Sequence, residues 1–128
     1  MTEIFRTDWP AVGTAVRQVN WMQLNPGGVT DWHSHEKQID HLVAVGSNIK
    51  LALWGAREDS PTRGATEVVR MGAFRPVTVI VPRRVWHALR NESGQPAGYI
   101  NIIDALYDHA EPDNWRLAPH AADIPDIL

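Results

Sequence analysis

The sequence predicts an all-β domain that closes into a small barrel, and three observations support this prediction. Short apolar runs of strand length alternate with turn residues at intervals of roughly 8–12 residues, which is typical of sandwiches and barrels. No segment carries a helical apolar stripe for more than one or two turns. His33 and His35 are spaced to point to one face of a strand, and His87 follows about fifty residues later. The three imidazoles can meet only if the sheet closes on itself.

The first half of the chain contains a half-buried strand followed by a hairpin. Residues 16–24 alternate apolar and polar side chains, and Asn25-Pro26-Gly27-Gly28 ends the pattern. Residues 38–45 and 49–54 are two further apolar runs, and Gly46-Ser47-Asn48 lies between them. Glycine and asparagine between two such runs are a hairpin signal.

The second half continues with short strands. Residues 66–70 form one that ends near Gly72, and residues 76–82 form a buried strand bracketed by prolines. Residues 85–89 and 99–103 complete the set. We expect the proline-containing tail beyond them to lie as irregular coil over the body. The order and length of these strands favour a jelly-roll barrel with little helix.

Composition limits the class of protein. At 128 residues the chain is one domain by length. It has no cysteine, which excludes disulfides and thiolate metal sites. The net charge is −3 and the basic residues are scattered, so we expect no nucleic-acid partner. There is no signal peptide and no apolar run of membrane length, so we expect a cytoplasmic protein without a membrane partner.

The histidines suggest a metal site or an imidazole pocket. His33, His35, Asp40 and His87 would suit one divalent ion such as Zn, Fe, Mn, Co or Ni. Asp40 is an odd number of residues from His35, so it needs a turn or bulge between them to reach the same face of the sheet. His41 is an even number of residues away and would share that face on an unbroken strand. The alternatives are a polar pocket without metal, or surface histidines.

Two motifs carry a resemblance to a known superfamily. Gly28-x₄-His33-x-His35-x₄-Asp40-x₅-Gly46 resembles the first cupin motif, with Asp40 where cupins usually have Glu. Gly72-x₉-Pro82-x₄-His87-x₃-Asn91 resembles the second. The expected domain is therefore a single cupin over residues 1–128, with its motifs at 28–46 and 72–91.

Other strings are similar to the short cupins grouped with dTDP-4-dehydrorhamnose 3,5-epimerase. They are Trp32-His33-x-His35-x-Lys37-Gln38-x-Asp40, Ala56-Arg57-Glu58-Asp59-Ser60-Pro61-Thr62-x-Gly64, Val81-Pro82-x-x-Val85-Trp86-His87 and Glu111-Pro112-Asp113-x-x-Arg116-Leu117. This resemblance covers nearly the whole chain from about Gly27. It implies an epimerase or isomerase that removes a proton next to the carbonyl of a nucleotide-linked 4-keto-6-deoxysugar or a related keto-sugar.

The resemblance also implies residue roles. By position His33 corresponds to the catalytic base, His41 to a lysine that stabilises the enolate, and His87 to the histidine of the second motif. The tyrosine that reprotonates the sugar carbon has Tyr99 nearby, although simple alignment places Asn101 close to its position. The arginine that contacts nucleotide phosphate in the full-length epimerases corresponds to Thr30. Those epimerases need no metal and lack a counterpart of His35.

Chemistry supports the same assignment. A base with a pKa near neutral and a positive group at the developing oxyanion are what proton abstraction next to a carbonyl requires, and histidine fits the first role. The expected machinery is His33 as base, His41 or His87 at the enolate, and Tyr99 or Tyr107 as the proton donor.

Substrate contacts and rival functions complete the expectations. Trp32, Trp54 and Trp86 are candidates for stacking on sugar or base, with core packing as the alternative for each. Arg83 and Arg84 are candidates for holding a phosphate, with an exposed loop pair as the alternative. The rival functions are a metal-dependent cupin isomerase or dioxygenase and a non-catalytic small-molecule-binding cupin. We expect a homodimer, because small barrels leave strand edges that a second chain can cover.

Overall fold

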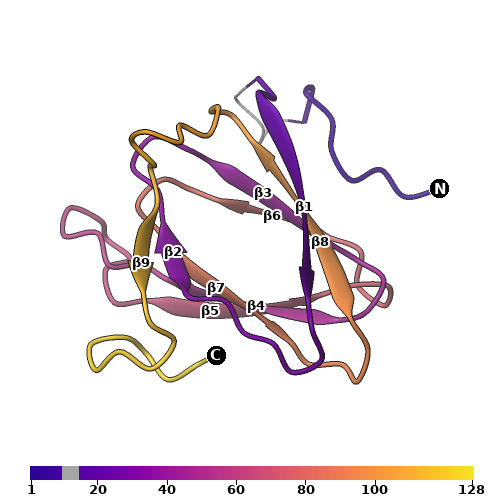
Figure 1. The fold of residues 1–128 in the computed structure, drawn as a ribbon. Coiled ribbons are helices and arrows are strands. Elements are labelled where there is room, and N and C mark those ends of the chain that lie inside the picture. The colour runs from indigo at the N-terminus through magenta and orange to yellow at the C-terminus, as the bar shows by residue number, and fades with distance from the viewer. Residues whose placement is uncertain (10–14) are drawn as a thin grey trace.

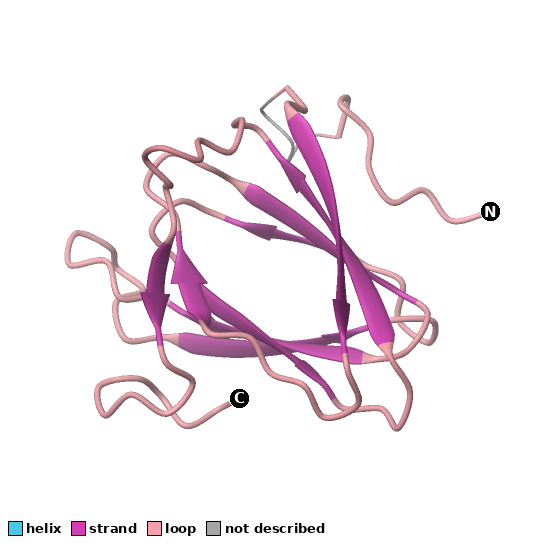
Figure 2. Ribbon diagram, in the orientation of Figure 1, coloured by secondary structure: helices cyan, strands magenta, loops and turns pink. Residues whose placement is uncertain are grey.

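A computed structural model describes residues 1–9 and 15–128 as two antiparallel sheets that face each other across a common interior (Figure 1). Within that part of the chain there are nine strands and no helix (Figure 2). The strands are β1 (Gln18–Leu24), β2 (Trp32–Ser34), β3 (Asp40–Val45), β4 (Ile49–Trp54), β5 (Thr66–Met71), β6 (Thr78–Val81), β7 (Trp86–Asn91), β8 (Ala97–Ile103) and β9 (Trp115–Leu117). The expected all-β, cupin-type jelly roll is confirmed.

The order of the strands follows the jelly-roll pattern. One sheet has the order β1-β8-β3-β6 and the other β5-β4-β7-β2-β9. The hairpin expected at Gly46-Ser47-Asn48 joins β3 to β4, which lie in different sheets, so this turn connects the sheets and does not form a two-stranded ladder. Gly46 has a φ of 89°, a conformation that glycine adopts without the strain a side chain would cause.

Alternation along the strands separates two apolar clusters. Leu42, Leu51 and Leu89 belong to the cluster that fills the interior between the sheets. Trp32 and Ala88, on alternate positions of their strands, belong to a second cluster on the outer face of the five-stranded sheet. The C-terminal residues Leu117, Ile124, Ile127 and Leu128 pack against this second cluster.

The tail is more ordered than expected at one point. Residues 115–117 pair with β2 as strand β9, and the rest of the tail is irregular, as the prolines predicted. This pairing adds the last strand to the five-stranded sheet. The tail that follows packs on the outer apolar cluster of this sheet. None of the described residues lies in a helix that is long and apolar enough to cross a membrane.

Candidate active site

A cavity of about 250 Å³ lies between the two sheets, and it brings together most of the predicted polar residues. Its polar lining comes from both sheets and from the tail: Asn20, His33, His35, Gln38, His87, Tyr99, Asn101, Tyr107, Asn114 and Arg116. Met22, Leu42, Leu89 and Ile103 supply the apolar wall. A concave pocket with an apolar wall and convergent polar groups is the usual form of a small-molecule site.

Asp40 is the buried centre of this site. Its side chain is 1% exposed, and Oδ2 lies 3.3 Å from Nε2 of His35 and 3.2 Å from Nε2 of His87. The amides of Gln38 and Asn101 donate hydrogen bonds to Oδ1 at 2.5 and 3.0 Å. Burial alone would raise the pKa of Asp40, but the hydrogen bonds from the two histidines outweigh it and hold the pKa well below its usual range.

The two histidines that face Asp40 are oriented by backbone carbonyls. Nδ1 of His35 contacts the carbonyl of Asp113, and Nδ1 of His87 lies 3.3 Å from the carbonyl of Val85. Burial lowers the pKa of His35, but the hydrogen bond and negative charge of Asp40 exceed that effect, so its pKa is raised. With an acceptor at each ring nitrogen, His35 can donate from both when it is protonated.

Three of the four expected metal ligands lie together. One ligand atom each from His35, Asp40 and His87 is within 4.8 Å of the others. The carbonyls at Nδ1 of both histidines match the outer-shell hydrogen bonds that orient metal-binding imidazoles. His33 is not a member of this group, which makes the site a triad and not the expected set of four. Asp40, and not His41, completes it, because the segment between His35 and β3 resets the alternation.

His33 lies beside the triad on the same wall of the cavity. In the sheet it pairs with His87 on one side and with Arg116 on the other, and its ring centroid is 6.1 Å from that of His87. Burial lowers the pKa of His33 to about 4, and the charges of His87, Arg116 and His35 act in the same direction. His33 is therefore neutral at physiological pH and has a proton-accepting nitrogen.

Tyr99 and Tyr107 also line the cavity. Burial, with a contribution from the charge of Asp40, raises the pKa of Tyr99 to about 12, so its hydroxyl keeps its proton at neutral pH. Tyr107 is 40% exposed and lies nearer solvent. Each hydroxyl is a group that can donate a proton to a bound molecule.

His41 lies away from the cavity. It follows Asp40 on β3 and therefore points to the opposite face of the strand. Its Nδ1 is 3.0 Å from the carbonyl of Ile102, and its ring packs edge-on against Phe5 at 5.1 Å. This geometry does not support the expected position of His41 at the enolate.

The expected substrate contacts also lie outside the cavity. Trp32 is fully buried in the outer apolar cluster, which is the core-packing alternative. Trp54 and Trp86 pack against this cluster, and Trp86 also lines a second pocket on the outer face of the sheet. Nε of Arg83 donates to the carbonyl of Lys37 at 2.6 Å, and its guanidinium forms an ion pair with Asp104 at 2.9 Å. These partners occupy Arg83 away from the histidines.

Arg116 and Asn114 are cavity residues that the sequence did not single out. With the amide oxygen of Asn114 turned toward Arg116, it accepts hydrogen bonds from the guanidinium at 3.0 and 3.1 Å. Arg116 belongs to one of the sequence segments that carry the family resemblance. Only the pairing of β9 with β2 shows that it lies opposite His33. Strand β9 is too short to give a periodic signal of its own.

The fold and the cavity define a cupin-type barrel with an imidazole-lined interior. No family model matches the chain. It is similar to a probable low-salt glycan biosynthesis epimerase, Agl13, of Haloferax volcanii, with 32% identity over 118 residues that cover 91% of this chain and 76% of the relative. A spore coat polysaccharide biosynthesis protein, SpsL, of Bacillus subtilis is 32% identical over 100 residues, covering 78% of this chain and 66% of that protein.

Solved structures agree on the fold. A dTDP sugar isomerase from Desulfovibrio desulfuricans superposes with a TM-score of 0.83 at 22% identity, covering 90% of this chain and 72% of that one. ChmJ, a 3'-monoepimerase from Streptomyces bikiniensis in complex with dTDP-quinovose, superposes with a TM-score of 0.78 at 24% identity. The match covers 90% of this chain and 60% of ChmJ. The chain therefore belongs to the family of cupin-type sugar epimerases related to dTDP-4-dehydrorhamnose 3,5-epimerase.

Proposed function

We propose that this protein is an epimerase or isomerase of a nucleotide-linked 4-keto-6-deoxysugar or a related keto-sugar, and that His33 is its base. The observation that carries the proposal is the pairing of a half-buried, neutral His33 with the cation Arg116 on one wall of the cavity. Membership of a sugar-epimerase family supports the reaction class.

The arrangement assigns a role to each group. His33 accepts the proton from the carbon next to the sugar carbonyl, and the electron pair of the broken C–H bond moves to the carbonyl oxygen as an enolate. The positive charge of Arg116, an exposed residue that lines the cavity, stabilises this oxyanion. Tyr99 or Tyr107 returns a proton to the carbon from another wall. Solvent then takes the proton from His33 and gives one to the tyrosine, which restores both groups. No other reactant is consumed.

The direct test is exchange of solvent deuterium into dTDP-4-keto-6-deoxyglucose. The wild-type protein should incorporate deuterium next to the carbonyl, whereas His33→Ala should lose incorporation and stay folded. His120→Ala, which changes an exposed histidine outside the cavity, is the matched control and should retain it. Exchange that survives in His33→Ala contradicts the assignment. Saturable binding by the wild-type protein without exchange would identify a binding module.

The triad favours a second candidate, a metal-dependent isomerase or dioxygenase. His35, Asp40 and His87 would hold the ion, and a divalent ion such as Zn, Fe, Mn, Co or Ni would act as a Lewis acid on a carbonyl. Elemental analysis of protein purified without a metal-affinity tag tests this directly. About one ion per chain, lost in His35→Ala, would establish the metal site. Deuterium exchange that persists after chelation would assign the reaction to His33 without a metal.

We also propose that the working form is a homodimer. β1 lies at the edge of its sheet, and within the described residues it pairs with β8 alone. Trp21 on this strand is 59% exposed. An edge strand with a large exposed indole is a surface that a second copy would cover.

A further inference from the structure

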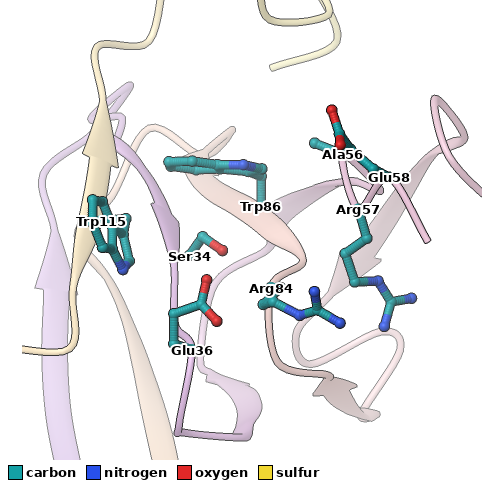
Figure 3. A pocket seen from close by; sticks show the side chains of 8 residues that line it. All are labelled: Ser34, Glu36, Ala56, Arg57, Glu58, Arg84, Trp86 and Trp115. Atoms are coloured by element: carbon teal, nitrogen blue, oxygen red, sulfur yellow. The ribbon is translucent and has the colours of Figure 1, made fainter. Parts of the chain in front are cut away.

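A second pocket lies on the opposite face of the strands that carry the active-site histidines. It has a volume of about 360 Å³ and is lined by residues from β2, β7 and β9 and from the loops beside them (Figure 3). Neighbouring positions on each strand alternate between the two sites. His33, His87 and Arg116 line the inner cavity, and Ser34, Trp86 and Trp115 line the outer pocket. One wall thus separates two sites of different chemistry.

Indole rings form the apolar part of the outer pocket. In Figure 3 the ring of Trp86 lies flat over the pocket, with Ser34 and the carboxylate of Glu36 on the side that this ring faces. Trp115 stands at one end and is 61% exposed, a large fraction for an indole. A flat indole face beside hydroxyl and carboxylate groups is suited to a sugar ring, whose C–H faces are apolar and whose edges donate hydrogen bonds.

Two guanidinium groups lie on the other side of the pocket. Arg57 and Arg84 project from different loops toward this end, as Figure 3 shows. Nε of Arg57 is buried and has no hydrogen-bond acceptor among the described residues. A buried N–H without an acceptor is unfavourable, and the guanidinium of Arg57 gains an acceptor if it turns toward an anionic oxygen in the pocket.

The backbone of Arg84 points to the same conclusion. Arg84 has a φ of 60°, which makes it the one non-glycine residue in the left-handed region among the residues described. Its N–H donates to the carbonyl of His35 at 2.7 Å, which holds the loop in this conformation. Strained backbone of this kind gathers at binding sites. At this position it directs a guanidinium to the pocket, where Asp59 contacts it at 3.1 Å.

We propose that the outer pocket binds a sugar that carries an anionic group, either a phosphate or a carboxylate. The ring stacks on Trp86 and Trp115, and Glu36 and Ser34 accept hydrogen bonds from its hydroxyls. The anion lies between Arg57 and Arg84 and completes the hydrogen bonding of Arg57. Because the wall separates this pocket from the cavity, binding does not depend on His33, nor on the proposed reaction.

The test is a titration with glucose 1-phosphate, glucuronate and glucose, followed by calorimetry and by the indole N–H resonance of Trp115 in NMR spectra. At least one of the two anionic sugars should bind saturably, and ten-fold or more tightly than glucose. The anionic sugar that binds more tightly shows whether the anionic group of the ligand is a phosphate or a carboxylate. Arg57→Gln and Trp115→Ala should each weaken binding at least ten-fold.

Two controls make the outcome decisive. Arg75→Gln removes an exposed arginine outside the pocket and should bind as the wild type does. His33→Ala should also bind normally. Absence of saturable binding by both anionic sugars, or equal binding by Arg57→Gln and Trp115→Ala, overturns the proposal. Loss of binding in His33→Ala overturns it too, because the ligand would then occupy the inner cavity.

Discussion

At the scale of single residues, the candidate active site depends on Asp40, a carboxylate that water cannot reach. Both of its oxygens are occupied, one by two imidazoles and the other by two amides. In a medium of low polarity these hydrogen bonds are stronger than in water, and removing one leaves its partner buried without a bond. It also connects the two sheets, since His87 is on β7 while Asp40 and Asn101 are on β3 and β8.

Replacing Asp40 should therefore destabilise the whole fold. Asp40→Asn removes the charge and turns one acceptor into a donor, which opposes at least one imidazole N–H. Breaking a buried charged pair typically costs about 3–5 kcal/mol, and we expect a loss of that size in urea-induced unfolding. Asp59→Asn, at a carboxylate whose side chain is 67% exposed, should change stability little. Equal stability of the two variants would contradict the central role of Asp40.

The protonation of His33 gives a prediction in pH. The folded pKa of about 4 lies below the ordinary value of 6.5, so the unfolded chain takes up this proton first as the pH falls. Stability from a neutral His33 is present above pH 6.5 and is lost as the pH falls toward 4. The base stays active over the same range, and its activity should fall only near pH 4.

The variant Arg116→Gln tests one contribution to the low pKa of His33, because burial is the largest cause and the charge of Arg116 is a smaller one. Removing a positive charge beside His33 should raise its pKa, so the acid limb of activity should move to higher pH. The His33 ring resonances, followed by NMR as the pH is lowered, should begin to move at a higher pH in the variant than in the wild type. Arg75→Gln, at an exposed arginine outside the cavity, is the control. Identical titrations in all three proteins would contradict the influence of Arg116.

At the scale of elements, all strands were predictable except β9. The alternation in residues 16–24 and the apolar run at 49–54 place β1 and β4 closely, and the spacing of His33 and His35 indicated β2. Strand β9 has three residues, which is too few for a period-2 pattern. Its existence depends on pairing with β2 across about eighty residues of sequence. For the same reason the sequence identified His33 but not its neighbour Arg116.

The choice between Asp40 and His41 shows a related limit. Parity from His35 favours His41, but residues 36–39 do not belong to a strand and the count restarts at Asp40. Trp32 shows a second limit of the sequence. It precedes His33 on β2, and adjacent side chains on a strand point to opposite faces. Only the tail, packed on the face of Trp32, shows that Trp32 is core.

Leu117 links the tail to the active site. It packs against the outer apolar cluster, while its neighbour Arg116 lines the inner cavity. Because Leu117 is half-buried, Leu117→Ala should cost about 1–3 kcal/mol, below the range of fully buried leucines. It should also slow deuterium exchange, because β9 then holds Arg116 less firmly. Leu106→Ala, at a leucine that is 63% exposed, should leave stability unchanged. A destabilised Leu117→Ala with full activity would show that β9 does not position Arg116.

At the scale of the whole molecule, the outer face of the four-stranded sheet differs from that of the five-stranded one. The tail covers the apolar cluster on the five-stranded sheet. On the other sheet Val19 and Trp21 of β1 are 58% and 59% exposed. The ring of Trp21 lies over Gly98 on β8, where an added Cβ would come within 2.1 Å of it. Glycine at this position allows the indole to lie flat on the sheet, which gives a smooth apolar surface at its edge.

This surface should be the contact between two copies of the chain. Trp21→Glu places a charge at its centre, and burying that charge without a partner is strongly unfavourable. We therefore expect a dimer for the wild type and a monomer for Trp21→Glu by light scattering coupled to gel filtration. Trp115→Glu, at a similarly exposed indole on the other sheet, should remain a dimer. A monomeric wild-type protein would contradict the proposed homodimer. A dimeric Trp21→Glu would show that the two copies contact each other through another surface of the barrel.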